Sequence, residues 1–260
     1  MEVVILPSAT EVGLLAARKI THLVGRRPGA VLGLATGSSP LAIYAALAAG
    51  VRDGSLDTRA VSAFALDEYV GIGVDHPESY ASVIRREVTE PLHLDPARVH
   101  VPDGRAADLA AAGERYEEAI RAAGGVDLQI LGIGANGHVG FNEPTSSFAS
   151  RTRIKTLTEQ TRADNARFFE RPEDVPTHCL TQGLGTISDA REVLLVAQGA
   201  GKAAAVAAAV EGPLASVCPA SVLQLHPHAT VIVDEEAAAG LRLAGYYRWT
   251  YAHKPDWQQP

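Results

Sequence analysis

Two adjacent carboxylates, Asp67 and Glu68, directly follow the apolar run at residues 62–66. If that run is a buried strand, the pair stands at a strand end, where α/β proteins bind their ligands. A carboxylate held there beside a sugar could move a proton between adjacent carbon atoms. An isolated Asp-Glu pair is more typical of a solvated acidic loop, so the pair predicts proton transfer only together with other groups.

A second cluster places His138 on a glycine-rich segment, with Asn136 two residues before it and Glu143 five residues after it. An amide and a carboxylate that flank a histidine can fix its tautomer and tune its pKa, which suits the imidazole to carry a proton. A lone histidine is usually structural, but one with two orienting groups at a strand end is less often so.

The same segment has Gly132, Gly134 and Gly137 in the Gly-x-Gly-x-x-Gly spacing of dinucleotide-binding sites. That motif requires a helix to begin within it, and residues 138–144 do not look helical. A nicotinamide enzyme is therefore the least favoured interpretation.

A third segment, Thr36-Gly37-Ser38-Ser39-Pro40, joins a predicted strand to a predicted helix. Glycine allows close approach of the backbone to an anion, the serines can donate hydrogen bonds, and proline suits the first helical turn. The helix N-terminus favours negative charge, so the segment suits a phosphate group. By itself it fits a plain capped turn equally well.

Basic residues form a further group. Period-two alternation in an extended segment places Arg151, Arg153 and Lys155 on one side, where their charges repel unless an anion or an acidic partner is present. Arg167 lies in a following helical stretch, and Lys202 opens the helix after the apolar run 192–197. Each cation taken alone fits a solvated surface position.

The elements that must position these groups alternate between strands and helices. This alternation predicts one α/β domain over residues 1–260, with a mainly parallel central sheet and helices on both faces. The predicted strands are 3–6, 31–35, 62–66, 126–134, 192–197 and 230–234, and the predicted helices are 11–24, 40–50, 80–88, 109–123 and 201–210. Gly50 is the predicted end of the second helix.

The composition is that of a globular protein, with 47% apolar and 20% charged residues. A formal net charge of −7 argues against a nucleic-acid surface. Cys179 and Cys218 lack the spacing of a zinc site, so no metal is expected. The N-terminus has no signal-peptide pattern and no apolar stretch is long enough to span a bilayer, which predicts a cytoplasmic protein without membrane partners.

Together these segments resemble the glucosamine-6-phosphate deaminases, within the superfamily of glucosamine-6-phosphate isomerases and 6-phosphogluconolactonases. The resemblance extends to about Tyr247 and rests on GLATGSSP, ALDEYVG, HPESY, LGIGANGHVGFNEP, SRTRIKTLT, the Arg-x-x-x-x-Arg-Phe-Phe stretch that ends at Phe169, QGAGKA and SVLQLHP. It implies a modified Rossmann-like α/β/α sandwich. It also implies hydrolytic deamination of glucosamine 6-phosphate to fructose 6-phosphate and ammonia, without a cofactor.

The resemblance assigns roles to the four acid, base and amide groups. Asp67 would move the proton between C2 and C1 of the open-chain sugar, and His138 would open the pyranose ring. Glu143 would orient and charge-tune His138. The family often has Asp where this chain has Asn136, and an amide can orient the imidazole but cannot stabilise its charge.

The phosphate would be held by Thr36, Gly37, Ser38 and Ser39 with charge from Arg167 and Lys202, below a mobile lid within about 153–182. Some family members are hexamers activated by N-acetylglucosamine 6-phosphate. The residues that match their effector site are Ser146, Ser147, Arg153 and Lys155, with Tyr246 as a further match, and they imply a homo-oligomer. The C-terminal segment 248–260 does not resemble the family's usual helical tail.

Two alternatives remain from different classes. A 6-phosphogluconolactonase would need a base that acts on water rather than on carbon, and the Asp67 loop and the full NGHVGFNEP turn favour the deaminase. A non-catalytic sugar-phosphate sensor would carry an attached DNA-binding module and eroded acid and base residues. The chain has no spare length for such a module, and Asp67, His138 and Glu143 are all present.

Overall fold

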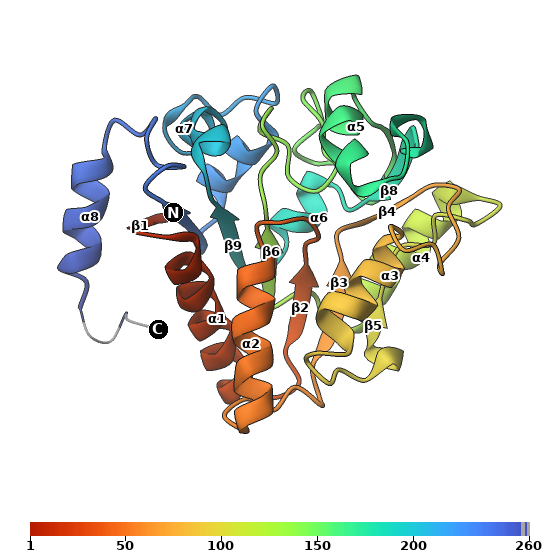
Figure 1. Ribbon diagram of the computed structural model, residues 1–260, viewed down its shortest axis with the longest axis horizontal. Helices are drawn as coiled ribbons and strands as arrows, with labels where there is room; N and C mark the ends of the chain where they lie inside the picture. Colours follow the sequence, from red (N-terminus) through yellow and green to blue (C-terminus); the bar gives the residue numbers. More distant parts are fainter. Residues whose placement is uncertain (256–257, 259–260) are drawn as a thin grey trace.

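The computed structural model describes residues 1–255 and 258, and its largest feature is a seven-stranded sheet (Figure 1). Each pair of neighbouring strands in this sheet is parallel. The α/β class and the parallel central sheet predicted from the alternation are therefore confirmed. The strand order is β1 (Glu2–Leu6), β10 (Ala229–Asp234), β9 (Glu192–Ala197), β6 (Leu128–Leu131), β2 (Val31–Leu34), β3 (Ser62–Ala65) and β5 (Val99–His100).

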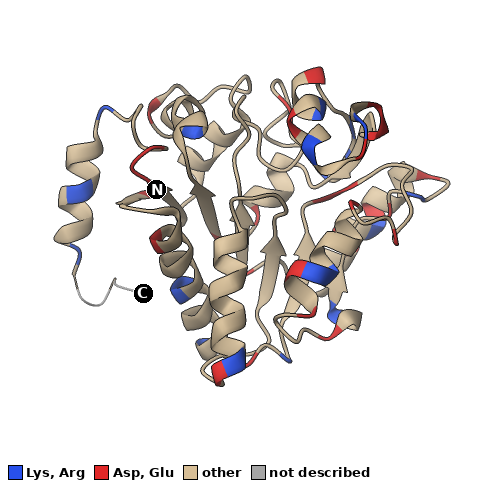
Figure 2. Cartoon of the chain, in the orientation of Figure 1, with Lys and Arg blue, Asp and Glu red and all other residues tan. Residues whose placement is uncertain are grey.

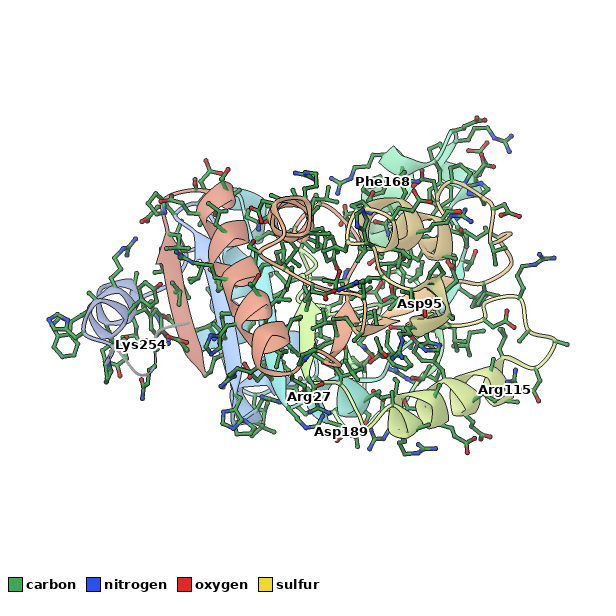
Figure 3. All side chains as sticks on the ribbon, turned by 90° about the horizontal axis from the view of Figure 1, so that it is seen from below. Arg27, Asp95, Arg115, Phe168, Asp189 and Lys254 are labelled. Carbon is green, nitrogen blue, oxygen red and sulfur yellow. The ribbon has the colours of Figure 1, made fainter. Side chains whose placement is uncertain are left out.

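Helices cover both faces of this sheet. α1 (Ala9–Arg26) and α2 (Leu41–Asp53) pack side by side on one face, and α4 (Leu109–Ala122) and α6 (Leu184–Ser188) lie on the other (Figure 3). The remaining helices are α3 (Tyr80–Ile84), which continues into a π-helical turn (Arg85–Thr89), α5 (Glu159–Asn165), α7 (Ala203–Glu211) and α8 (Ala244–Ala252). Short 3-10 turns span Pro96–Arg98, Ala166–Phe168, Pro172–Asp174, Ala200–Lys202 and Pro219–Leu225.

The first helix shows how local sequence and burial agree. Ser8 caps α1 by accepting a hydrogen bond from the Glu11 amide at 3.3 Å, and its hydroxyl donates to the Glu11 carboxylate at 3.0 Å. This Ser-x-x-Glu arrangement satisfies groups that a helix start leaves free. Val12, Leu15 and Ile20 then face the core at helical spacing.

The second helix does not end at Gly50 as predicted. α2 continues to Asp53, and Gly54 ends it with φ of 81°, a left-handed conformation that glycine adopts without strain. Gly50 is retained within the helix where the chain folds back, because a Cβ there would lie 3.2 Å from Ser55 Oγ. Glycine thus serves close packing at one position and the turn at the other.

A second sheet of three antiparallel strands was not predicted. Its order is β4 (Asp67–Tyr69), β8 (His178–Thr181) and β7 (Arg153–Thr156). Residues 67–69 were expected to form a loop, but they pair with residues 179–181, more than 100 positions away in the chain. The sequence around β4 could not show this pairing, because both partners are short and far apart.

Charged residues lie on helices and loops around the central strands, of which β2 and β6 carry none (Figure 2). In the described part of the chain no helix has both the length and the apolar character needed to cross a bilayer. α8 (Ala244–Ala252), which contains the start of the segment 248–260 that does not resemble the family's tail, lies beside the edge strand β1 (Figure 1).

Candidate active site

The ends of four neighbouring strands create one cavity. β9, β6, β2 and β3 are adjacent and parallel, so their C-terminal ends meet at the same edge of the sheet. The cavity has a volume of about 310 Å³. The residues of its wall that matter below are Thr36, Gly37, Ser38, Ser39, Asp67, Tyr69, Tyr80, His138, Phe141, Thr161, Asp164, Arg167, Phe168, Phe169 and Lys202.

Asp67 lines this cavity while only 5% of its surface is exposed. Burial, together with the neighbouring charge of Glu68, raises the pKa of Asp67 to about 7. Thr181 Oγ1 donates to Asp67 Oδ2 at 3.3 Å and holds the carboxyl in place. A carboxyl group that titrates near neutral pH can both take up and release a proton at the cavity wall.

Glu68 does not face the cavity, although the two carboxylates are adjacent in sequence. Its oxygens accept hydrogen bonds from the amides of Tyr69 at 2.8 Å, Tyr80 at 2.9 Å and Ala81 at 2.9 Å. Successive side chains of a strand point to opposite sides, which separates the two groups. The sequence could not say which of them would face a substrate.

His138 lines the cavity from the turn that follows β6, and its side chain is 17% exposed. Its imidazole packs flat on Gly134, where a Cβ would lie 2.3 to 2.5 Å from the ring atoms. His138 Nδ1 is 3.6 Å from Glu143 Oε2, beyond hydrogen-bond length but close enough for attraction when the ring is charged. This arrangement supports a proton carrier at Nε2.

Glu143 lies behind His138 and is 3% exposed. Burial acts to raise its pKa, but His138, Thr161 and Asn136 together lower the pKa of Glu143 to about 2. Thr158, the N-cap residue of α5, donates through its amide and its hydroxyl to Glu143 Oε1, each at 3.2 Å. The carboxylate therefore stays ionised at neutral pH and joins the histidine to the start of α5.

Asn136 takes a different position from the one its sequence suggested. Its Nδ2 donates to Glu143 Oε2 at 2.8 Å, and its Oδ1 accepts from the backbone amide of His138 at 3.1 Å. The imidazole itself is not its partner. Asn136 orients His138 through the main chain and through Glu143, because the turn at Gly137 bends the chain back over the amide side chain.

The segment at residues 36–39 forms one wall of the cavity. Gly37 has φ of 91°, so the chain turns where only glycine is free of strain. Pro40 stands at the N-cap of α2 and no side chain caps that helix, which leaves first-turn amides for an anion. Gln198 Nε2 donates to Ser39 O at 3.2 Å and ties the segment to the end of β9.

Two cations complete this wall of the cavity. Lys202 reaches it from the 3-10 turn between β9 and α7, and Arg167 from the 3-10 turn after α5. Burial lowers the pKa of Lys202, Asp164 acts in the opposite direction, and Arg167 adds to the lowering. The sequence placed these cations 35 positions apart, and the fold brings both to the wall that holds Ser38 and Ser39.

An aromatic wall was missed in the sequence. Tyr69 packs against Tyr80, Phe141 and Phe169 with ring centroids 4.9, 5.6 and 5.7 Å apart. Tyr80 and Phe141 stack on each other at 5.9 Å. Tyr80 and Phe141 stood inside the motifs HPESY and GFNEP, which was the available signal. Tyr69 and Phe169 stood inside ALDEYVG and the Arg-Phe-Phe stretch. Their contacts with one another depend on the second sheet, which the sequence did not reveal.

Comparison with known proteins matches the whole arrangement to one family. The family model described as glucosamine-6-phosphate isomerases/6-phosphogluconolactonase matches residues 8–232. The chain belongs to this family. The membership confirms the resemblance drawn from the motifs and places the strand-end cavity within a known group of sugar-phosphate proteins.

Curated relatives extend over nearly the full length. A protein of Streptomyces coelicolor named glucosamine-6-phosphate deaminase is 63% identical over 259 residues, 99% of each chain. One of the same name from Arthrobacter sp. is 64% identical over 258 residues, again 99% of each chain.

Solved structures agree with this family. A structure described as a monomeric glucosamine-6-phosphate deaminase is 40% identical, has a TM-score of 0.90, and aligns over 92% of this chain and 100% of its own. The 6-phosphogluconolactonase of Trypanosoma brucei has a TM-score of 0.72 at 20% identity, over 92% of this chain and 98% of its own. At that identity the likeness shows the shared fold alone.

The residues that match the family's effector site lie partly behind the catalytic turn. Arg153 donates to Asn142 Oδ1 at 2.9 Å, and Ser146 Oγ donates to Glu143 O at 2.7 Å. Lys155 shares the half-buried side of β7 with Arg153, as period-two alternation predicted. Ser147 is exposed on the same loop as Ser146.

Two of the expected neighbours are elsewhere. Arg151 pairs with Asp189 at 2.5 Å, which supplies the acidic partner that the basic row required. Tyr246 is 61% exposed on α8, at the opposite end of the molecule from β7 and β8 (Figure 1). Within one chain the fold does not bring Tyr246 to the other effector-site residues.

Proposed function

We propose that this protein converts glucosamine 6-phosphate and water to fructose 6-phosphate and ammonia. The observation that carries the proposal is the single cavity that Asp67 and His138 share with the segment 36–39. An aldose–ketose proton transfer needs an acid/base group that works near neutral pH, and the raised pKa of Asp67 meets that need. The names of the full-length relatives agree with this substrate.

His138 opens the sugar ring. Its imidazole gives a proton to the ring oxygen while the C1 hydroxyl loses its own, which yields the open-chain aldehyde. Glu143, ionised at neutral pH, stabilises the imidazolium form from behind. Asn136 fixes His138 and Glu143 relative to each other through its two hydrogen bonds.

Asp67 then moves a proton between neighbouring carbons. Its carboxylate removes the proton from C2 while the C1 aldehyde oxygen takes a proton from His138, which gives an enol; the carboxyl group then returns its proton to C1 as the C2 amine gives a proton back to His138. The product of this step is an imine at C2. Water adds to C2 and ammonia leaves, which gives the ketone of fructose 6-phosphate and balances every atom of the reaction.

The phosphate is bound by the amides and hydroxyls of Thr36, Ser38 and Ser39 with Lys202 and Arg167. Arg167 belongs to the segment 153–182, which we propose acts as a lid. Phe168 and Phe169 line the cavity from that segment. A closed lid would exclude water while the enol intermediate exists.

The deciding experiment measures ammonia and fructose 6-phosphate formed from glucosamine 6-phosphate. Equimolar products are expected from the wild type, and Asp67→Asn is expected to lower kcat by at least ~10³-fold with KM nearly unchanged. Substrate binding with no product from the wild type would favour the sensor alternative. Hydrolysis of 6-phosphogluconolactone in place of deamination would favour the lactonase.

We infer that the enzyme acts in the cytoplasm in amino-sugar breakdown, as a homo-oligomer with N-acetylglucosamine 6-phosphate as effector. Support comes from the clustering of Ser146, Arg153 and Lys155 beside the catalytic turn. The 40% identical structure described as monomeric makes the oligomeric state the first of these points to measure.

A further inference from the structure

Glu68 is a buried carboxylate that touches the active-site wall from behind. It is 5% exposed, and its two oxygens accept three backbone amides, two of which are the first amides of α3 at Tyr80 and Ala81. Ser79 accepts from the next amide, that of Ser82, at 3.1 Å. The start of α3 is therefore fully paired, and Glu68 supplies the long-range part of that pairing.

This pairing positions a cavity residue. Tyr80 is the first residue of α3, and its ring lines the cavity between Tyr69 and Phe141. Gly104 packs closely against Glu68 and Tyr69. A Cβ at Gly104 would lie 3.3 Å from Glu68 Cγ and 2.1 Å from Tyr69 O. The carboxylate points toward the start of α3, where it accepts the amides of Tyr80 and Ala81.

A neutral side chain could also accept the first amides of α3, so capping alone does not explain why residue 68 carries a charge. A buried negative charge one residue from Asp67 disfavours the ionised form of Asp67 and costs stability. Burial raises the pKa of Glu68 itself, and its three backbone hydrogen bonds act in the opposite direction. Such a cost is retained at functional sites more than elsewhere.

Charged groups of both signs line the cavity with Asp67, namely Glu78, Arg86, Glu87, Asp164, Arg167 and Lys202, and buried groups on other elements pack near it. Tyr69 on β4, Tyr80 on α3 and Tyr116 on α4 all have raised pKa values because they are buried. The same holds for the thiol of Cys179 on β8. His138 faces the same cavity and is a cation when protonated. Of the charged groups described here, Glu68 is the one whose charge acts to raise the pKa of Asp67.

We propose that Glu68 is a positioning residue for the proton transfer: it fixes Tyr80 against the cavity and, by its charge, sets the pH at which Asp67 becomes a base. The proposal rests on the function proposed above for Asp67. Glu68 touches no reacting atom in this scheme. It acts through the start of α3 and through the electrostatic field at its neighbour on β4.

The test compares Glu68→Gln with Glu68→Asp and Thr181→Val. In the wild type we expect the acid limb of the kcat/KM–pH profile near pH 7. Glu68→Gln removes the charge and should move that limb down by about one pH unit. Glu68→Asp retains the charge and should leave the limb in place even if kcat falls. Thr181→Val removes a hydrogen bond to the Asp67 carboxylate and should move the limb up.

A role limited to capping α3 would lower kcat in both Glu68 variants without moving the limb, and that outcome overturns the proposal. Carboxyl-carbon NMR titration gives a readout that needs no activity, with the Asp67 resonance assigned by its loss in Asp67→Asn. The Asp67 resonance should titrate at lower pH in folded Glu68→Gln. If the Gln variant does not fold, Glu68→Asp tests the charge: the Asp67 resonance should titrate where it does in the wild type, and a shift to lower pH contradicts the proposal.

These readouts separate two failures. A wild type that makes no fructose 6-phosphate, with the NMR titrations as expected, would refute the proposed reaction and leave the influence of Glu68 on Asp67 intact. Normal turnover with an Asp67 resonance that is insensitive to Glu68→Gln would refute the present inference alone.

Discussion

At the scale of single residues, the site places one carboxyl where it is reactive and another where it is permanently charged. Asp67 is buried with few donors, and its pKa rises to about 7. Glu143 is buried as well, but its polar neighbours lower its pKa to about 2. The number of hydrogen-bond donors around each group decides between these outcomes. One group can therefore exchange protons while the other stabilises positive charge.

The raised pKa of Asp67 predicts a pH-dependent cost in stability. The folded protein holds this proton more tightly than the unfolded chain, whose ordinary value is 3.8. The contribution of Asp67 to stability is therefore highest below about pH 4, falls as the pH rises to 7, and is lowest above 7. The difference corresponds to a free energy on the order of 4 kcal/mol. Asp67→Asn should raise the melting temperature at pH 8.5 and leave it nearly unchanged at pH 4. Equal gains at both pH values would contradict the prediction.

Asn136 predicts a second pH effect. In Asn136→Asp the donor to Glu143 is lost and two carboxylate oxygens meet across the present 2.8 Å contact. The added negative charge favours the protonated imidazole of His138, so the activity profile should move up by about one pH unit. Asn136→Ala adds no charge and serves as the control, with lower activity and no upward move. Indistinguishable profiles for the wild type and Asn136→Asp would refute this.

At the scale of elements, the turn between β9 and α7 positions Lys202. Gly199 opens this turn with φ of 84°, and its amide donates to both oxygens of Asp234 at 3.0 Å. Asp234 also accepts from the Ala237 amide at 2.8 Å, and Glu236 accepts from Ala200 at 3.2 Å. The end of β10 thus holds the turn that presents Lys202 to the cavity, where we propose that the phosphate binds.

This geometry predicts that Asp234→Ala raises KM for glucosamine 6-phosphate more than it lowers kcat. A displaced Lys202 weakens phosphate binding in the ground state and the transition state alike, and the rise should be about tenfold, or ~1.4 kcal/mol. Glu236→Ala is the matched control, with a smaller effect because Glu236 is exposed and makes one such bond. A lower kcat at constant KM would contradict the argument.

At the scale of the whole molecule, the catalytic cavity and α8 lie apart. Phe168 at the cavity and Lys254 after α8 stand at opposite sides of the molecule (Figure 3). Tyr246 could therefore join Arg153 and Lys155 only across a contact between chains. An effector site that includes Tyr246 therefore requires an oligomer, so the two predictions depend on each other.

N-acetylglucosamine 6-phosphate is accordingly expected to raise the melting temperature of the wild type by a few degrees and to alter its kinetics with glucosamine 6-phosphate. Lys155→Ala should abolish both responses, since it removes one of the two cations on the half-buried side of β7. Analytical ultracentrifugation with and without the effector measures the assembly. A monomer that does not respond would overturn the pair of predictions.

The sequence by itself determined the chemistry and the main sheet. Helical and strand periodicities are local, so they predicted the alternation of elements, and parallel strands necessarily bring Thr36, Asp67, His138 and Lys202 to one edge. The resemblance had chosen Asp67 over Glu68, but only the tertiary structure decided that Glu68 turns away to the start of α3, that Asn136 holds Glu143, and that aromatic rings form a wall. Those outcomes depend on the second sheet, in which β4 pairs with β8 across more than 100 residues and β8 pairs with β7. Such pairing is set by how the whole chain packs, and no short window of sequence contains it.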